Sequence, residues 1–360
     1  MKNNRGGAYV HIPFCRAKCA YCGFYSMCAS AQTIHEYALR LVRQIRSDKP
    51  GFVLDTAYIG GGTPSLLEPE DLGAVCEALW EIGLQPGAEF TAEVNPESVT
   101  DAFLETAKRG GVNRISMGVQ SFDDAELRQL GRLADTETCL RAVERIRKHG
   151  FENLSIDLML AIPGQSDASL MQTLRRTVEL RPEHLSAYLL KVEDGTPFAR
   201  AGICEQDEEV QRRRYLDTSA FLSEHGYEHY EISNFARPGF RARHNSSYWQ
   251  GKPYAAYGCG AHGYDGVRRW YYAEDAEAFL RTGKARKITE QVLTEEDRHQ
   301  ERILLGLRTS DGIRTTDIAP EKRFLLPLLA ERGLLCFTTD GFALTPEGFL
   351  VSDAVILQLW

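Results

Sequence analysis

Short apolar runs alternate with longer amphipathic stretches along the first half of the chain. The apolar runs have the length of buried strands and cover residues 8–12, 56–59, 89–94, 114–120, 154–160 and 184–190. The stretches between them carry apolar residues at helical spacing, over residues 32–45, 69–82, 101–109, 123–130, 136–149 and 168–180. Strands that alternate with helices in this way are typical of parallel βα units, so the pattern predicts an α/β fold.

The alternation stops near residue 195. A charged helix is predicted over residues 207–225, and helical spacing returns at 297–308 and 323–332. Residues 334–344 read as a hairpin turned by Asp340-Gly341, and helices followed by a small hairpin resemble a winged-helix module. We therefore expect three parts: the βα domain at 1–195, a linker or extension at 196–290, and a C-terminal helical, winged-helix-like domain at 291–360.

Composition favours a soluble globular protein. The chain has 360 residues, of which 43% are hydrophobic and 26% charged, enough for a barrel-sized domain and a smaller one. A net charge of −8 argues against nucleic acid as the main partner. No apolar run reaches the roughly 18 residues of a membrane span, and residues 1–5 lack a signal-peptide core. With nine cysteines, an odd number, we expect a cytoplasmic protein rather than a disulfide framework.

Three cysteines follow the first predicted strand at once. Cys15, Cys19 and Cys22 lie in one short loop after Pro13. Thiolates hold iron–sulfur clusters, and a cube of four irons needs one outer ligand per iron, so three cysteines leave one iron open for chemistry. The alternatives are a zinc knuckle, a disulfide or scattered buried thiols; zinc usually requires a second ligand pair, which the neighbouring sequence does not offer. Cys28 is the one nearby thiol that could close the cluster.

Further polar features follow the next strands. The segment Gly60-Gly-Gly-Thr-Pro-Ser65 comes after the second strand, and glycines there would let the backbone approach a ligand. Glu93 and Gln120 lie near the ends of the third and fourth strands, and Asp157 lies within the fifth. Each alone is more often a cap or an ion-pair partner. Because parallel strands end at one rim, we expect the set to gather there.

The spacing Cys-x3-Cys-x2-Cys resembles that of the radical S-adenosylmethionine (SAM) superfamily. The resemblance covers residues 8–190 and implies a partial (βα)6 barrel that holds a [4Fe-4S] cluster on Cys15, Cys19 and Cys22. SAM chelates the fourth iron in that family. In the branch that includes oxygen-independent coproporphyrinogen III dehydrogenase, which can hold one or two SAM molecules, the matching SAM-binding positions are Tyr9, Tyr21, Gly61, Gly62, Thr63, Glu93, Gln120, Arg132 and Asp157.

A second motif lies in the less regular half of the chain. His244 follows a basic loop and precedes Tyr248 and Trp249. A loop histidine beside aromatic residues is more often a hydrogen-bonded structural residue, yet neutral imidazole is also a common axial ligand of haem iron. The two aromatic side chains could supply a flat apolar surface for a macrocycle.

His-Asn-x-x-Tyr-Trp, with Tyr-Glu-Ile-Ser-Asn-Phe-Ala before it and Tyr-Gly-Cys-Gly-Ala-His after it, resembles the HemW family of haem chaperones over nearly the whole chain. The resemblance implies that His244 contributes to haem binding and that haem passes to an acceptor protein, such as one of the respiratory chain. Phe24 stands where the dehydrogenase has a fourth cysteine, which favours the chaperone. The alternative is a radical SAM oxidoreductase acting on a tetrapyrrole. Leu160-Ala-Ile-Pro163 departs from the usual Tyr-Gly-Leu-Pro of both.

Overall fold

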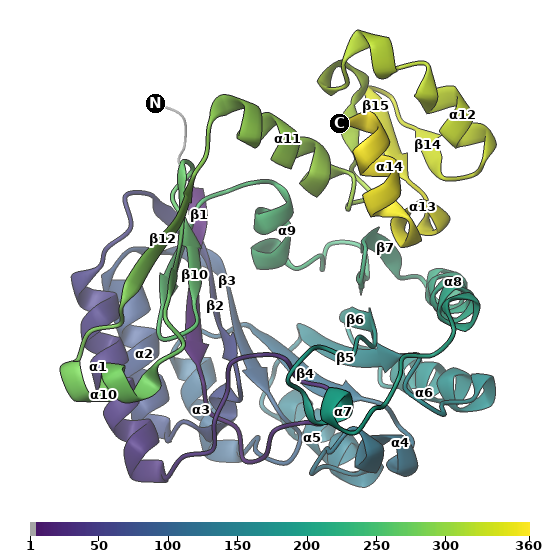
Figure 1. Ribbon diagram of the computed structural model, residues 1–360. Coiled ribbons are helices and arrows are strands. Elements are labelled where there is room, and N and C mark those ends of the chain that lie inside the picture. Colours follow the sequence, from purple (N-terminus) through teal and green to yellow (C-terminus); the bar gives the residue numbers. More distant parts are fainter. Residues whose placement is uncertain (1–4) are drawn as a thin grey trace.

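Six parallel strands form the centre of one large, curved sheet. The computed structural model describes residues 5–360, so residues 1–4, on which part of the signal-peptide prediction rests, lie outside the described chain. The six strands are neighbours in chain order. They are β1 (Arg5–Ile12), β2 (Val53–Gly61), β3 (Leu84–Val94), β4 (Arg114–Gln120), β5 (Leu154–Leu160) and β6 (His184–Leu189). Figure 1 shows an open sheet rather than a closed barrel, which confirms the predicted partial barrel.

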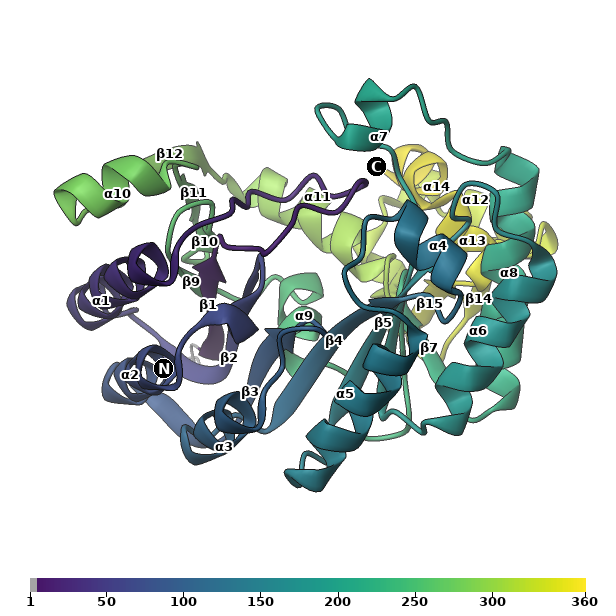
Figure 2. The same cartoon turned by 90° about the horizontal axis from the view of Figure 1, so that it is seen from below.

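The connecting helices cover the outer face of this sheet (Figure 2). They are α1 (Ala31–Ser47), the 3-10 turn η1 (Pro64–Leu66), α2 (Pro69–Glu81), α3 (Asp101–Arg109), α4 (Asp124–Gln129), α5 (Thr136–Lys148) and α6 (Asp167–Glu179). Several begin at a side chain that accepts a hydrogen bond from the first helical turn, among them Ser30, Thr100 and Asp135. Each helix buries its apolar stripe against the strands, which explains why helical spacing in the sequence located it.

The chain after residue 195 extends the same sheet at both edges. Beyond β6 lie β8 (Asn234–Ala236) and β7 (Glu228–Glu231), both antiparallel. Beyond β1 lie β9 (Tyr254–Tyr257), β10 (His262–Tyr264), β11 (Arg268–Tyr272) and β12 (Lys287–Val292). Helices α7 (Pro197–Arg200), α8 (Glu208–Glu224), α9 (Arg243–Trp249) and α10 (Ala276–Thr282) connect these strands. The predicted linker or extension is thus an extension of the main sheet.

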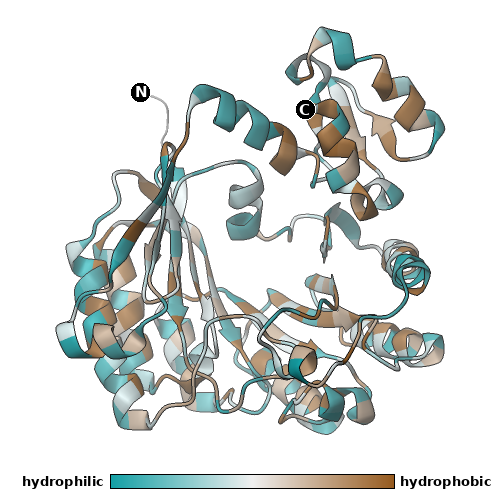
Figure 3. Cartoon of the chain, viewed as in Figure 1, coloured by the Kyte–Doolittle hydropathy of each residue, from teal (hydrophilic) through white to brown (hydrophobic). Residues whose placement is uncertain are grey.

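A small C-terminal unit packs beside β7. It contains α11 (Glu295–Gly306), β13 (Ile313–Arg314), η2 (Thr315–Asp317), η3 (Pro320–Lys322), α12 (Leu325–Glu331), β14 (Leu335–Phe337), β15 (Gly341–Leu344), α13 (Pro346–Leu350) and α14 (Ser352–Leu359). Its three strands pair in the order β13-β15-β14, so the predicted hairpin is present. Figure 3 shows that α11, which leads into this unit, is hydrophilic over most of its length. Within residues 5–360, no helix is long and apolar enough to cross a membrane.

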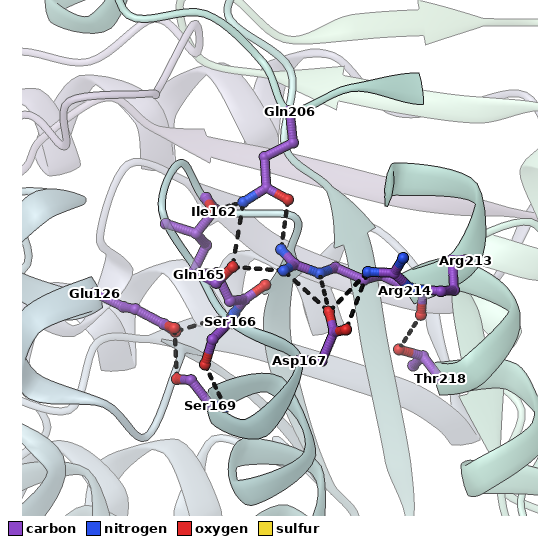
Figure 4. Close-up of polar contacts among 10 residues, drawn as sticks. All are labelled: Glu126, Ile162, Gln165, Ser166, Asp167, Ser169, Gln206, Arg213, Arg214 and Thr218. Atoms are coloured by element: carbon purple, nitrogen blue, oxygen red, sulfur yellow. Dashed lines mark hydrogen bonds and ion pairs between the residues drawn. The ribbon is translucent and has the colours of Figure 1, made fainter. Parts of the chain in front are cut away.

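A buried arginine joins α8 to the loop that precedes α6 (Figure 4). The Arg214 guanidinium donates to the Asp167 carboxylate at 3.1 Å, to the Gln165 carbonyl at 2.5 Å and to the Gln206 side-chain oxygen at 2.5 Å. Its side chain is only 5% exposed, whereas that of Arg213, which bonds the same carboxylate, is 48% exposed. This network fixes the chain after β6 against the barrel.

Candidate functional site

A cavity of about 710 Å³ lies inside the curved sheet, with its rim at the carboxyl ends of the parallel strands. Ten of the residues singled out in the sequence line it: Cys15, Cys19, Tyr21, Cys22, Gly61, Gly62, Glu93, Gln120, Arg132 and Asp157. Tyr9 does not line the cavity itself, but its ring stacks on that of Tyr58, which does. The predicted gathering of polar residues at one rim is therefore observed.

The three predicted cluster cysteines face this cavity together. The Thr63 hydroxyl donates to the Cys15 sulfur at 3.5 Å, and the Arg132 guanidinium donates to the Cys19 sulfur at 3.5 Å. Burial raises the pKa of the Cys15 and Cys22 thiols, so binding a metal centre there would release protons. Cys28 is exposed and donates to the Arg16 carbonyl at 3.4 Å, and it does not line the cavity. Three thiols with hydrogen-bond donors beside them suit a cluster with one open iron.

The Gly-Gly-Thr segment is shaped by packing as well as by any ligand. The amides of Gly62 and Thr63 donate to the Ile12 and Phe14 carbonyls at 2.8 and 2.7 Å, so the N–H groups expected to face a ligand are used within the protein. A Cβ on Gly62 would come within 2.6 Å of the Phe14 carbonyl oxygen. These glycines let the loop press against the strand that leads to the cysteines, which explains their place in the sequence without a ligand.

Glu93 is held in place by two donors. The Tyr58 hydroxyl bonds one carboxylate oxygen at 2.6 Å, and the Gly61 amide bonds the other at 3.1 Å. Burial raises the pKa of Glu93 to about 7; the bond from Tyr58 opposes this rise, and the nearby Asp157 carboxylate adds to it. Burial likewise raises the pKa of Asp157. Glu93 can therefore exchange a proton near neutral pH, and the ionised form of either acid is favoured when a cation enters.

Gln120 and Arg132 shape the rim between β4 and the cysteine loop. Gln120 ends β4 with φ 75°, a left-handed conformation that is costly for a residue with a Cβ and that recurs at ligand sites. Arg132 donates to the Gly118 carbonyl at 2.6 Å and to the Asn95 side-chain oxygen at 2.9 Å. Because the backbone and Asn95 fix this guanidinium beside Cys19, it can also face an anionic group near the cluster loop.

The second motif lies at the opposite end of the strands. His244 is on helix α9, not in a loop as the sequence suggested, and it is 1% exposed. Its ring is beside Gly7, at the start of β1, whereas the cysteine loop follows the end of β1. The residues from Gly7 to Ile12 span about 17 Å of strand. In Figure 1, α9 lies at the upper end of the sheet and the loop after β1 at the lower end.

Both ring nitrogens of His244 have partners. Nδ1 lies 2.8 Å from the Thr56 hydroxyl, and Nε2 lies 2.7 Å from the Tyr248 hydroxyl. Burial lowers the pKa of His244 to about 3, with a smaller effect from the positive charge of Arg114. The imidazole is therefore neutral at physiological pH, and the Tyr248 bond occupies the nitrogen that is not held by Thr56. Trp249, on the other side of α9, lines a separate cavity of about 650 Å³ beside the C-terminal unit.

The comparisons with known proteins agree with this geometry. The family model "Radical SAM superfamily" matches residues 9–177, and "HemN C-terminal domain" matches residues 293–351. The protein "Heme chaperone HemW" of Bacillus subtilis (strain 168) is 33% identical, over 97% of this chain and 97% of its own length. The chain belongs to the HemW family. The protein of the same name from Lactococcus lactis subsp. lactis (strain IL1403) is 36% identical, over 87% of this chain and 84% of its own length.

One solved structure shares the whole fold. The Escherichia coli protein described as "Coproporphyrinogen III oxidase (HemN)" superposes with a TM-score of 0.83, over 98% of this chain and 89% of that chain. The two sequences are 24% identical, so the likeness shows the fold alone. This HemW-family chain thus combines a radical SAM domain, which implies a [4Fe-4S] cluster and SAM, with the HemN-type C-terminal unit.

Sequence reasoning missed many residues of the cavity, and two of them matter for its chemistry. Tyr58 and Arg114 both line it, yet each was read only as part of a strand. The sequence could have indicated Arg114. Arg114, Ser116 and Gly118 are every second residue of β4, so they share the face of the strand that lines the cavity. A charged residue on the inner face of an apolar strand is costly to bury and is therefore a candidate for function.

Proposed function

We propose that this protein binds haem, carries a [4Fe-4S] cluster with SAM in the main cavity, and passes haem to an acceptor protein. The observation that carries the proposal is the similarity to proteins named "Heme chaperone HemW" over almost their full length. The acceptor is a haem protein, such as one of the respiratory chain, reached from the cytoplasm.

The rim residues are proposed to hold the cluster and SAM. Cys15, Cys19 and Cys22 would bind three irons, and SAM bound at the fourth would bring a sulfonium that the reduced cluster can cleave. Around it we place the same SAM-binding residues as the resemblance implied: Tyr9, Tyr21, Gly61, Gly62, Thr63, Glu93, Gln120, Arg132 and Asp157. The Glu93 and Asp157 carboxylates would bind the cationic groups of SAM, and the Arg132 guanidinium would bind its carboxylate.

The affinity for SAM should rise with pH through the ionisation of Glu93. With a pKa of about 7, Glu93 is mostly protonated at pH 6 and mostly ionised at pH 8. If the carboxylate binds the SAM cation, affinity should increase about tenfold between these values, because binding at pH 6 must first remove the proton. Equilibrium dialysis with cluster-loaded protein measures this. Glu93→Gln should flatten the dependence; a slope that survives in this variant assigns the titration to another group.

His244 is proposed to be the haem ligand, with Tyr248 and Trp249 contributing to the haem site. Haem iron would compete with the Tyr248 hydroxyl, which lies 2.7 Å from Nε2. Tyr248→Phe should therefore strengthen haem binding several-fold, since the iron no longer has to replace a hydrogen bond worth about 1 kcal/mol. Titration followed by the Soret band measures the change. Weaker binding in Tyr248→Phe would mean that the hydroxyl itself contacts the haem.

The experiment that tests haem binding is an anaerobic titration of cluster-loaded wild type beside His244→Ala. Saturable binding that is weakened in the variant and restored by added imidazole supports His244 as the ligand, because imidazole can fill the space left by the ring. The thermal stability of both proteins is measured alongside, since His244 is buried and its loss also removes two hydrogen bonds. If wild type binds no haem, the proposal fails, and turnover of coproporphyrinogen III with SAM and a reductant becomes the next assay.

A further inference from the structure

Arg114 is a buried cation with unsatisfied N–H donors. It begins β4, is 1% exposed, and is among the largest of the fully buried side chains. Its Nε and Nη1 atoms are buried with no hydrogen-bond partner among residues 5–360. A buried guanidinium without hydrogen bonds costs several kcal/mol. A ligand that bonds this guanidinium would offset the cost, so the unsatisfied donors indicate a binding site.

The nearby acids are held by other donors. Glu93 accepts from Tyr58 and Gly61, and Asp157 has the Ser116 hydroxyl at 3.4 Å from both carboxylate oxygens. Arg114 lines the same cavity as these acids, so its guanidinium faces a space large enough for a ligand. The cavity wall thus offers a guanidinium whose Nε and Nη1 donors are unused, and a guanidinium is the group that best fits a carboxylate.

A carboxylate bound by Arg114 cannot lie at the cluster end of the cavity. Gln120 at the rim lies six positions further along β4, which is about 20 Å of strand. A carboxylate held at the open iron of the cluster is therefore too far away. Arg114 lies instead at the end of the barrel where α9 carries His244, and Asn245 of the same helix lines the cavity. The Arg114 charge lowers the pKa of His244 and His184, and it also lowers the pKa of Glu93 and Asp157. Arg114 therefore lies between α9 and the acids of the cavity.

We propose that Arg114 binds a carboxylate of the ligand that enters from the α9 end of the cavity, namely a propionate of haem. The inference rests on the proposed function and adds to it the place of the haem: inside the barrel, between α9 and the SAM-binding rim. One ligand would then contact Arg114 through a propionate and His244 through its iron. His244 does not line the cavity, so the iron contact requires its ring to give up the bond to Tyr248. A haem at this place does not touch Trp249, which lines the other cavity, so the inference assigns the haem contact to the His244 side of α9. The cavity beside Trp249, which also contains arginines, is the competing location.

The test compares haem with haem dimethyl ester, in which both propionates are blocked. Wild type should bind haem about tenfold or more tightly than the ester, because a charge-assisted contact is lost. Arg114→Gln should remove this preference, and Arg114→Lys should keep part of it. The matched control is Arg241→Gln, which alters an arginine of the cavity beside Trp249 and should leave the preference intact. A preference lost in Arg241→Gln and kept in Arg114→Gln would overturn the proposal.

A second arm separates haem from SAM as the source of the carboxylate. Loss of the Arg114 charge raises the pKa of Glu93, so SAM binding is compared at about pH 9, where Glu93 is ionised. There equilibrium dialysis should show that Arg114→Gln binds SAM as wild type does; a loss of SAM affinity at this pH with unchanged haem preference would assign Arg114 to SAM and overturn the proposal. If Arg114→Gln does not fold, Arg114→Lys takes its place in the comparison. Equal affinities of wild type for haem and for its dimethyl ester would overturn the proposal without any variant. If wild type binds neither, the proposed function itself has failed, which is a distinct result.

Discussion

Replacing Cys15, Cys19 or Cys22 with alanine, one at a time, should abolish the iron–sulfur cluster, whereas Cys28→Ala should retain it. The three thiols line one cavity, and a cube of four irons with SAM on the fourth needs all three. Cys28 is exposed and turned toward the Arg16 carbonyl, so it is the matched control for the loss of a nearby thiol.

The measurement is the iron content and the visible absorbance after anaerobic reconstitution, with the electron paramagnetic resonance signal of the reduced protein. Each of the three variants should fall to background in both. A cluster that persists in one of them, and disappears only when Cys28 is also replaced, would show that Cys28 can act as a ligand and that no iron is left open for SAM.

Arg214→Ala should lower the free energy of unfolding by about 3 kcal/mol, because it removes a buried guanidinium that packs against α6 and leaves the buried Gln165 and the partly buried Gln206 without this donor. The side chain bonds Asp167, Gln165 and Gln206 at once (Figure 4). Urea unfolding followed by circular dichroism measures the loss.

Arg213→Ala is the control for that measurement. Arg213 bonds the same Asp167 carboxylate but is half exposed, and surface ion pairs contribute about 0–1 kcal/mol. The expected difference between the two neighbours isolates burial as the cause. Equal losses in both variants would show that the Asp167 contact, rather than the buried network, carries the stability.

The parallel core was predictable because its physics is local. Residues 114–120 and 154–160 were predicted with the bounds that the structure has, since strands buried on both faces read as apolar runs. The strands outside the parallel core were not found: β8 and β10, for example, have three residues each, too few to show an alternating pattern. Helix α9 has seven residues and no capping side chain, so its sequence was read as a loop.

The residues at the rim of the site could be predicted from the sequence, but their hydrogen-bond partners and the position of the histidine motif could not. The cysteines, Glu93, Gln120 and Asp157 could be placed together, because parallel strands end at one edge. The partners of those groups depend on contacts between distant segments, such as the Tyr58 bond to Glu93 and the Thr56 contact with His244. The sequence gives no sign that the histidine motif faces the far end of the same barrel, because that follows from how residues 196–290 fold back.

The most direct test of the account is the rate at which haem leaves the cluster-loaded protein for an apomyoglobin trap, with and without SAM. If SAM binds at the cysteine rim and haem binds at the α9 end of the same cavity, SAM should change this rate several-fold in wild type. In Cys15→Ala, which cannot hold the cluster, SAM should leave the rate unchanged. The same rate with and without SAM in wild type would contradict the claim that one cavity links the cluster to the release of haem.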